Sequence, residues 1–274
     1  MARTSDSRIV NLSNSPIFFS FFTWGFGTGA QNLGRPLFAF AVTGNVFLVG
    51  LLLASNAVPR IFAGPLTGFL TDKFGRKPLV ILSCTIRGAT NVGQFFTGDY
   101  ATFFLLEIIG QIGVAMWATS SNVLLSDVTR NETRGRVLAV RQMSTRLGFV
   151  AGPAAGGILA SVFGLSSVFL LNGVSKIVIV IVVLFMVRET KPDRPASHSD
   201  EPKPTLKERA EPFKDPAFVV LSLATIAFSM SQAGVVQTLI PVHVPDALGG
   251  DAAAVGFLLS LGALITFFFA LPAG

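Results

Sequence analysis

Runs of about twenty apolar residues recur from one end of this chain to the other, and each run is long enough to cross a bilayer as a helix. Lipid offers no hydrogen-bond partner to a free backbone amide, so such a chain must satisfy its backbone within helices. Hydrophobic residues make up 51% of the chain and charged residues 13%, which leaves too few polar residues to cover a water-soluble domain. The runs predict seven complete spans and an eighth that is cut short: 16–37, 46–70, 78–96, 101–125, 137–161, 165–187, 217–240 and 252–274. We therefore expect an all-α integral membrane protein surrounded by a lipid bilayer.

The basic residues of the loops lie on one side of the predicted membrane. Loops that follow even-numbered spans carry lysines and arginines, among them Lys73, Arg130 and Arg188, whereas the odd-numbered loops carry none. By the positive-inside rule, the amino terminus and the even-numbered loops face the cytoplasm, and we expect a multi-pass protein of the cell membrane (plasma or inner). The formal net charge of +6 at pH 7 is thus explained by topology, and no nucleic-acid partner is expected.

An internal repeat relates the second span to the eighth. Residues 49–68 align without gaps on residues 255–274, with seven identical positions. Repeated halves are common among transporters. Because Gly274 corresponds to Gly68, where a charged turn begins, we expect the sequence to be truncated and to lack the second half of its own fold.

The longest polar segment divides the chain into two parts. Residues 188–215 contain five prolines interleaved with charges, a composition that builds no packed core. We expect residues 1–187 to form a six-helix transmembrane bundle, 188–215 a cytoplasmic linker, and 216–274 part of a second bundle.

The charged turn between the second and third spans, residues 68–77, reads Gly-Phe-Leu-Thr-Asp-Lys-Phe-Gly-Arg-Lys. It resembles the G-x-L-x-D-x-x-G-R-K signature loop of the major facilitator superfamily of secondary transporters at every fixed position. The resemblance implies a helical bundle like that of the superfamily, with the complete first six-helix half and the start of the second. It also implies a cytoplasmic gate formed by this loop and an acid at the end of the fourth span. The residues at these positions are Gly68, Asp72, Gly75, Arg76, Lys77 and Asp127.

A glycine-rich motif lies in the fifth span. Gly148, Gly152, Pro153, Gly156 and Gly157 match every fixed position of G-x-x-x-G-P-x-x-G-G, and the segment resembles the motif of the antiporter branches of the same superfamily. That resemblance implies export rather than uptake. Small residues at this spacing also occur in membrane helices for close packing alone, and the two interpretations are compatible.

Charges inside the predicted spans point to the machinery of transport. Arg35, Arg60, Arg87, Arg146 and Lys176 lie within spans, with Glu107 as the only acid. Such charges must face a cavity or a partner, because each is costly in hydrocarbon. The antiporter branches carry an arginine where this chain has Glu107. A buried carboxylate is itself able to carry a proton, so Glu107 is our candidate for proton coupling.

Polar residues at helical spacing give some spans one polar face. The resemblance implies that the first, fourth and seventh spans line a central cavity. The candidate cavity residues are Trp24, Thr28, Gln31, Arg35, Arg60, Gln111, Trp117, Arg146, Ser229 and Gln232. A further stripe on the third span, Ser83, Arg87, Asn91 and Gln94, is expected to join helices to one another.

The favoured function is proton-coupled export of a small amphipathic or drug-like compound by alternating access, with protons and the compound as partners. An excess of cations inside the spans favours a neutral or anionic compound. Uptake or exchange of an organic anion or a sugar by the same fold is the alternative, and a non-transporting multi-helix receptor is a remote one. Cys84 is the single cysteine, and His198 and His243 are isolated in the sequence. No enzyme activity, cofactor or metal site is therefore expected.

Overall fold

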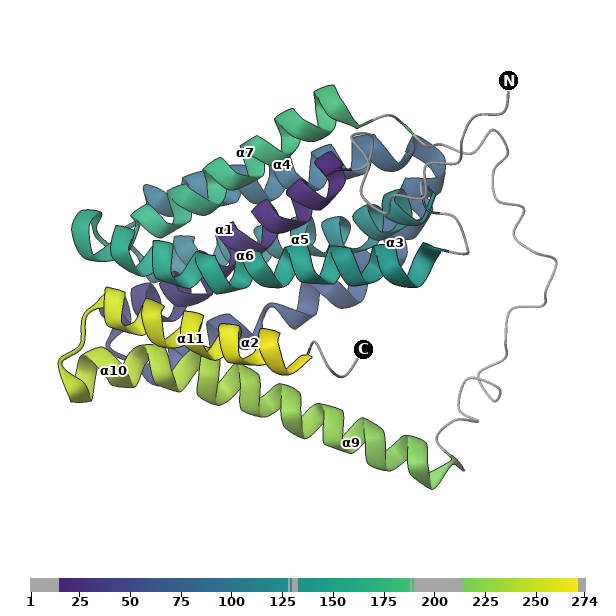
Figure 1. The fold of residues 1–274 in the computed structure, drawn as a ribbon. Coiled ribbons are helices and arrows are strands. Elements are labelled where there is room, and N and C mark those ends of the chain that lie inside the picture. The colour runs from purple at the N-terminus through teal and green to yellow at the C-terminus, as the bar shows by residue number, and fades with distance from the viewer. Residues whose placement is uncertain (1–14, 128, 130–132, 188, 190–213, 271–274) are drawn as a thin grey trace, which may run out of the picture.

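The computed structural model describes residues 15–127, 129, 133–187, 189 and 214–270, and every regular element in this part of the chain is a helix (Figure 1). The first bundle consists of α1 (Ser15–Thr43), α2 (Val46–Ala54), α3 (Ala57–Phe74), α4 (Arg76–Phe95), α5 (Tyr100–Asp127), α6 (Arg134–Phe163) and α7 (Ser167–Met186). The later elements are α9 (Pro216–Ser231), the π-helical segment η3 (Gln232–Leu239), α10 (Ile240–Leu248) and α11 (Ala252–Ala270). Most of the predicted linker lies outside the described residues.

The later helices lie along one side of the first bundle (Figure 1). Within the bundle, α1 packs between α6 and α7, and α4 packs between α5 and α7. Helix α11 lies against α6, and α1 itself contacts η3, α10 and α11. This arrangement makes α1 and α6 the wall that the first bundle presents to the later helices.

Two predicted spans differ from the structure. The second span, expected as one helix over 46–70, is divided into α2 and α3 around Ser55 and Asn56, and α3 continues to Phe74. The seventh span, expected to end at residue 240, continues helically to Leu248. Pro241 lies where the π-helical segment η3 gives way to α10, and this proline does not end the helix. Gly249 ends it instead, with the left-handed φ of 66° that glycine readily adopts.

Three helices in the described part of the chain, α5, α6 and α7, are long and apolar enough on those grounds alone to cross a membrane. Shorter apolar helical segments occupy Pro216–Phe228 and Ala252–Phe268. Helices α1 and α4 carry polar side chains that the bundle buries, and these lower the hydropathy of both helices. Their lengths of 29 and 20 residues nevertheless match a bilayer core of about 30 Å.

The first bundle has two apolar layers with a polar layer between them. One apolar layer contains Trp24 and Trp117, whose rings stack with centroids 4.5 Å apart. The other contains Phe38, Phe103 and Phe169, whose rings contact one another edge to face or stacked. Along α1 and α5, the polar residues lie between these two aromatic groups in the sequence, so the buried charges are sealed at both ends.

Candidate functional site

The polar layer is organised around Glu107 of α5, whose side chain is completely buried. Arg35 of α1 donates through Nη1 to Oε1 of Glu107 at 2.8 Å. Arg87 of α4 donates through Nη1 to Oε2 and through Nη2 to Oε1, both at 3.3 Å. Two buried guanidinium groups therefore share one carboxylate.

Amide side chains complete the shell of Glu107. Gln94 donates to Oε2 at 2.9 Å, Gln111 donates to Oε1 at 2.7 Å, and Gln31 donates to Oε2 at 3.4 Å. The amide oxygen of Gln31 in turn accepts from Arg87 at 2.7 Å and from Asn172 of α7. The network thus joins α1, α4, α5 and α7 through buried side chains, and Arg87 and Gln94 join helices as the stripe on the third span predicted.

Several predicted cavity residues lie inside the bundle instead of on a cavity wall. Gln31, Arg35 and Gln111 belong to the Glu107 network. Trp24 and Trp117 form the stacked pair, and Thr28 contacts Lys176. The physical reason for this difference is that the polar face of α1 turns toward α4, α5 and α7, whose polar residues satisfy it. The proton-coupling role of Glu107 stays a prediction.

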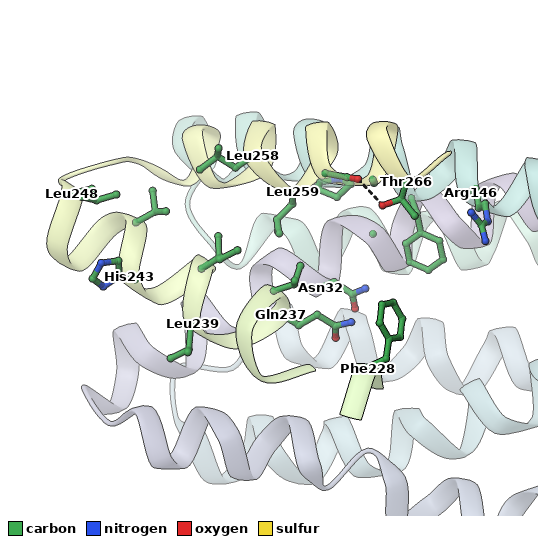
Figure 2. Close-up of a pocket in the computed structure, with 18 residues that line it drawn as sticks. Asn32, Arg146, Phe228, Gln237, Leu239, His243, Leu248, Leu258, Leu259 and Thr266 are labelled. Carbon is green, nitrogen blue, oxygen red and sulfur yellow. Dashed lines mark hydrogen bonds between the residues drawn. The ribbon is translucent and has the colours of Figure 1, made fainter. Parts of the chain in front are cut away.

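A cavity of about 1140 Å³ lies between the first bundle and the later helices. Its polar lining residues are Asn32, Arg146, Gln237, His243 and Thr266, and Figure 2 shows Arg146 and His243 at opposite ends of it. The remaining lining is apolar or small and consists of Gly29, Phe149, Pro153, Phe228, Val236, Leu239, Ile240, Val244, Leu248, Leu258, Leu259, Gly262 and Ala263. Among the described lining residues there is no Asp or Glu.

Of the predicted cavity residues, Arg146 is the one that lines this cavity. The side chains of Arg60, Ser229 and Gln232 lie outside the described part of the structure. Asn32 connects the cavity to the buried network, because Arg35 donates through Nη2 to Oδ1 of Asn32 while Arg35 also holds Glu107.

Sequence reasoning missed four polar lining residues, Asn32, Gln237, His243 and Thr266. Gly25, Gly29 and Asn32 are spaced by four and three residues, so they share one face of α1. This spacing could have predicted a second functional face on the helix. His243 was assigned to an outer loop because α10 was not recognised. Nothing in the spacing of Gln237 or Thr266 distinguishes them from other polar residues of their helices.

The predicted gate residues Arg76 and Asp127 are in contact. Arg76 donates through Nε to Oδ2 of Asp127 at 2.9 Å, and its backbone N–H donates to Oε1 of Glu189 at 3.0 Å. Lys77 donates to the carbonyl of Leu184 at 2.7 Å. Gly75 joins α3 to α4 with a φ of 100°, which only glycine adopts without strain. This turn therefore connects α4 to α5 and to the end of α7.

Two other residues of the predicted gate are Asp72 and Gly68. The side chain of Asp72 lies outside the described part of the structure. Among the described residues, no atom lies within 4 Å of the position that a Cβ at Gly68 would take, apart from its own helix and chain neighbours, so this part of the chain makes no close helix contact there. A gating role for the turn stays a prediction.

The glycine-rich motif of α6 faces two neighbours. On one face, a methyl group added at Gly148 would lie 2.3 Å from the carbonyl oxygen of Phe22, and one added at Gly152 would lie 2.2 Å from that of Phe26. A methyl group added at Gly156 would lie 2.8 Å from the Cβ of Ala30 of α1. These three glycines therefore allow α1 and α6 to approach at backbone distance.

The other face of the motif meets α11. A methyl group added at Gly157 would lie 2.6 Å from the carbonyl oxygen of Ala252, and one added at Gly256 would lie 2.4 Å from that of Pro153. Ser260 of α11 accepts from the backbone N–H of Ala154 at 2.9 Å. The motif thus forms the contact between the first bundle and α11, next to the cavity.

A bundle of apolar helices with sealed internal charges, and a cavity against helices from a second part of the chain, define a multi-pass helical membrane protein. The family model described as Major Facilitator Superfamily matches residues 17–274, and the chain belongs to that superfamily.

Named relatives are similar over much of this chain. Multidrug resistance protein 2 of Bacillus subtilis (strain 168) is 24% identical over 223 residues, which cover 79% of this chain and 55% of the relative. The multi-drug resistance efflux pump PmrA of Streptococcus pneumoniae serotype 4 is 25% identical over 198 residues, covering 72% of this chain and 44% of the pump. The chain spans about half the length of these curated relatives.

Among solved structures, the human organic anion transporter MFSD10 (TETRAN) has the same fold. It superposes with a TM-score of 0.65 at 16% sequence identity, and the match covers 93% of this chain and 70% of the transporter.

Proposed function

We propose that this chain belongs to a secondary active transporter that exports a small amphipathic compound in exchange for protons by alternating access. The observation that carries the proposal is the cavity between α1 and α6 on one side and η3, α10 and α11 on the other. A volume of about 1140 Å³ exceeds what drug-sized ligands usually need, about 300–1,000 Å³. Its position between two parts of the chain is where a rocking motion would expose it to either side of the membrane in turn.

The lining of the cavity favours a neutral or anionic amphipathic compound. Most lining residues are apolar, so they would bind the hydrophobic part of such a compound, while Asn32, Gln237 and Thr266 offer hydrogen bonds. Arg146 supplies a positive charge, and the described lining supplies no carboxylate to bind a cation. An anion would therefore gain a charge-assisted hydrogen bond where a cation would meet repulsion.

Two features support export as the direction. The motif in α6 resembles that of antiporter branches, and it forms the tight contact between the first bundle and α11 that limits leak through the protein. The relatives Multidrug resistance protein 2 and PmrA are named for drug resistance and efflux. We further propose that the Arg76–Asp127 pair closes the cytoplasmic side in one state of the cycle and opens in the other.

The alternative is uptake or exchange of an organic anion or a sugar by the same fold. A flux measurement separates the two directions. The protein produced from its own gene is reconstituted into liposomes, and a pH gradient is imposed with an anionic amphipathic dye, carboxyfluorescein, or a cationic one, ethidium. We expect the gradient to drive the anionic dye in the direction opposite to the protons. Movement in the same direction as the protons would establish uptake instead, and no gradient-dependent flux of either dye would contradict the proposal.

Arg146 provides a matched test of the cargo charge. We expect Arg146→Gln to weaken binding of carboxyfluorescein about tenfold or more, because a hydrogen bond to a charged group contributes about 1.5–3 kcal/mol. Arg141→Gln is the control: Arg141 lies on the same helix but contacts Asn122 and the ring of Phe21, away from the cavity lining. Equal dye affinity in both variants, measured by fluorescence anisotropy, would remove Arg146 from the binding site.

A further inference from the structure

A second buried charge, Lys176 of α7, lies outside the Glu107 network. Its side chain is fully buried, and its Nζ lies 3.3 Å from the carbonyl oxygen of Trp24 and 3.3 Å from Oγ1 of Thr28. The same nitrogen lies 4.0 Å from the centroid of the Trp24 ring. In the described part of the chain, no carboxylate comes within ion-pair distance of Lys176. The buried acid Glu107 pairs with two arginines instead.

The charged and titratable groups around Lys176 offer its ammonium no compensation. From α4, the thiol of Cys84 and the guanidinium of Arg87 lie near it. From α1 the contacts are a carbonyl, a hydroxyl and an indole, and the charge on that helix, Arg35, is positive. Helix α6 also meets α7, and its described charged residues are the arginines Arg134, Arg136, Arg141 and Arg146. A buried lysine among such neighbours has no anion to offset the cost of its desolvation when it is charged.

We infer that Lys176 is a proton-binding residue of the transport cycle, an inference that rests on the proton coupling proposed above. In one state, the lone pair of the neutral amine takes a proton from water on one side of the membrane, and the resulting ammonium donates to Trp24 and Thr28. In the other state, the N–H bond breaks, the electron pair stays on Nζ, and the proton passes to water on the opposite side. A lysine that is charged in one state and neutral in the other needs weak, neutral partners, and Trp24 and Thr28 provide them.

The contacts of Lys176 reach the cavity wall through one helix. Thr28 accepts from Lys176, and its neighbours on α1, Gly29 and Asn32, line the cavity. Helix α1 also packs at backbone distance on α6 through Gly148 and Gly152, so a shift of α1 is transmitted to α6. Loss of the proton from Lys176 would release α1 from α7 at this point and so change the wall that the cargo contacts.

The tryptophans of the chain report directly on this proton. Trp24 and Trp117 are the two tryptophans in the sequence, they are stacked, and the Lys176 nitrogen lies over the first of them. An ammonium over an indole face interacts with its π-system, whereas a neutral amine does so far less, so protonation alters the emission. We expect the tryptophan emission of the protein from its own gene, in detergent, to titrate with pH. This titration should be lost in Lys176→Met and in Lys176→Arg.

Controls make the fluorescence result decisive. Trp24→Phe removes the reporting ring and should also lose the titration while leaving Lys176 in place. Lys176→Arg keeps a long cationic side chain that holds its proton, so it serves where Lys176→Met fails to fold. A titration unchanged in either folded Lys176 variant would overturn the inference.

Flux separates this inference from the proposed function. In liposomes, Lys176→Met or Lys176→Arg should lose the dye movement driven by a pH gradient and retain exchange of dye at equal pH on both sides. If the unaltered protein shows no gradient-driven flux, the proposed function fails, and the fluorescence titration alone decides whether Lys176 binds a proton. If the unaltered protein is driven by the gradient and both variants are driven equally well, Lys176 is not the coupling residue.

Discussion

At the scale of single residues, Glu107 is the centre of the buried polar network. Its carboxylate accepts from Arg35 and Arg87, and its removal would leave two buried guanidinium groups without an anion. Breaking a buried ion pair by removing one partner typically costs about 3–5 kcal/mol. We expect Glu107→Gln to lower the free energy of unfolding by about this amount, measured as a lower thermal unfolding midpoint in detergent.

The matched control for Glu107→Gln is Asp215→Asn. Asp215 is exposed and accepts from the backbone N–H of Ala217 at the start of α9, a capping role that asparagine fills equally well. Its unfolding midpoint should therefore stay unchanged. If Glu107→Gln unfolds at the same temperature as this control, Glu107 does not hold α1, α4 and α5 together.

The sequence was informative about which residues are polar and less so about their partners. The resemblance to the superfamily implied a gate that includes Arg76 and Asp127, and the structure shows that these two residues are in contact. The sequence did not predict that Arg35 and Arg87 converge on Glu107, because helical spacing shows which face of a helix is polar but not which neighbour that face meets. Asn172 was missed for the same reason, although its spacing of four from Lys176 marks a polar face on α7.

At the scale of helices, α6 determines how the two parts of the chain meet. Gly152 faces α1, where a methyl group would lie 2.2 Å from a backbone oxygen, whereas Gly135 of the same helix has no atom within 4 Å of that position. We expect Gly152→Ala to destabilise the protein by about 1–3 kcal/mol, the usual cost of overpacking. The matched control Gly135→Ala should be neutral or slightly stabilising, because alanine favours the helix.

The stability of Gly152→Ala and Gly135→Ala is measured by thermal unfolding in detergent, and their transport by dye flux in liposomes. Gly152→Ala should also reduce flux, since α1 and α6 together form the cavity wall. If Gly152→Ala and Gly135→Ala behave alike, the close contact between α1 and α6 is absent in the membrane.

The helix boundaries show where sequence patterns stop being sufficient. Apolar runs located each span, but the division between α2 and α3 has no Gly or Pro at Ser55 and Asn56 to mark it. The extension through α10 was missed because Pro241 and Pro245 are usually read as the end of a helix. The structure shows that the helix continues past both prolines to Leu248.

At the scale of the whole molecule, the two parts of the chain meet at a cavity whose described lining is apolar and positively charged. The buried layer around Glu107 reaches that cavity at Asn32, and the contacts of Lys176 reach it one turn away on the same helix. In the proposed mechanism, cargo and proton therefore both act on one element, α1. Because both sites contact α1, this helix offers a physical route that couples cargo binding to proton binding without direct contact between cargo and proton.

Thiol labelling at Gln237 tests most directly whether this cavity holds the cargo. In a Cys84→Ser background, Gln237→Cys places a thiol in the lining, and Asp99→Cys places one on the exposed turn between α4 and α5. A water-soluble maleimide is applied with and without carboxyfluorescein. We expect the dye to slow labelling of Gln237→Cys and to leave Asp99→Cys unaffected, and equal labelling rates with and without dye at both positions would show that the cargo binds elsewhere.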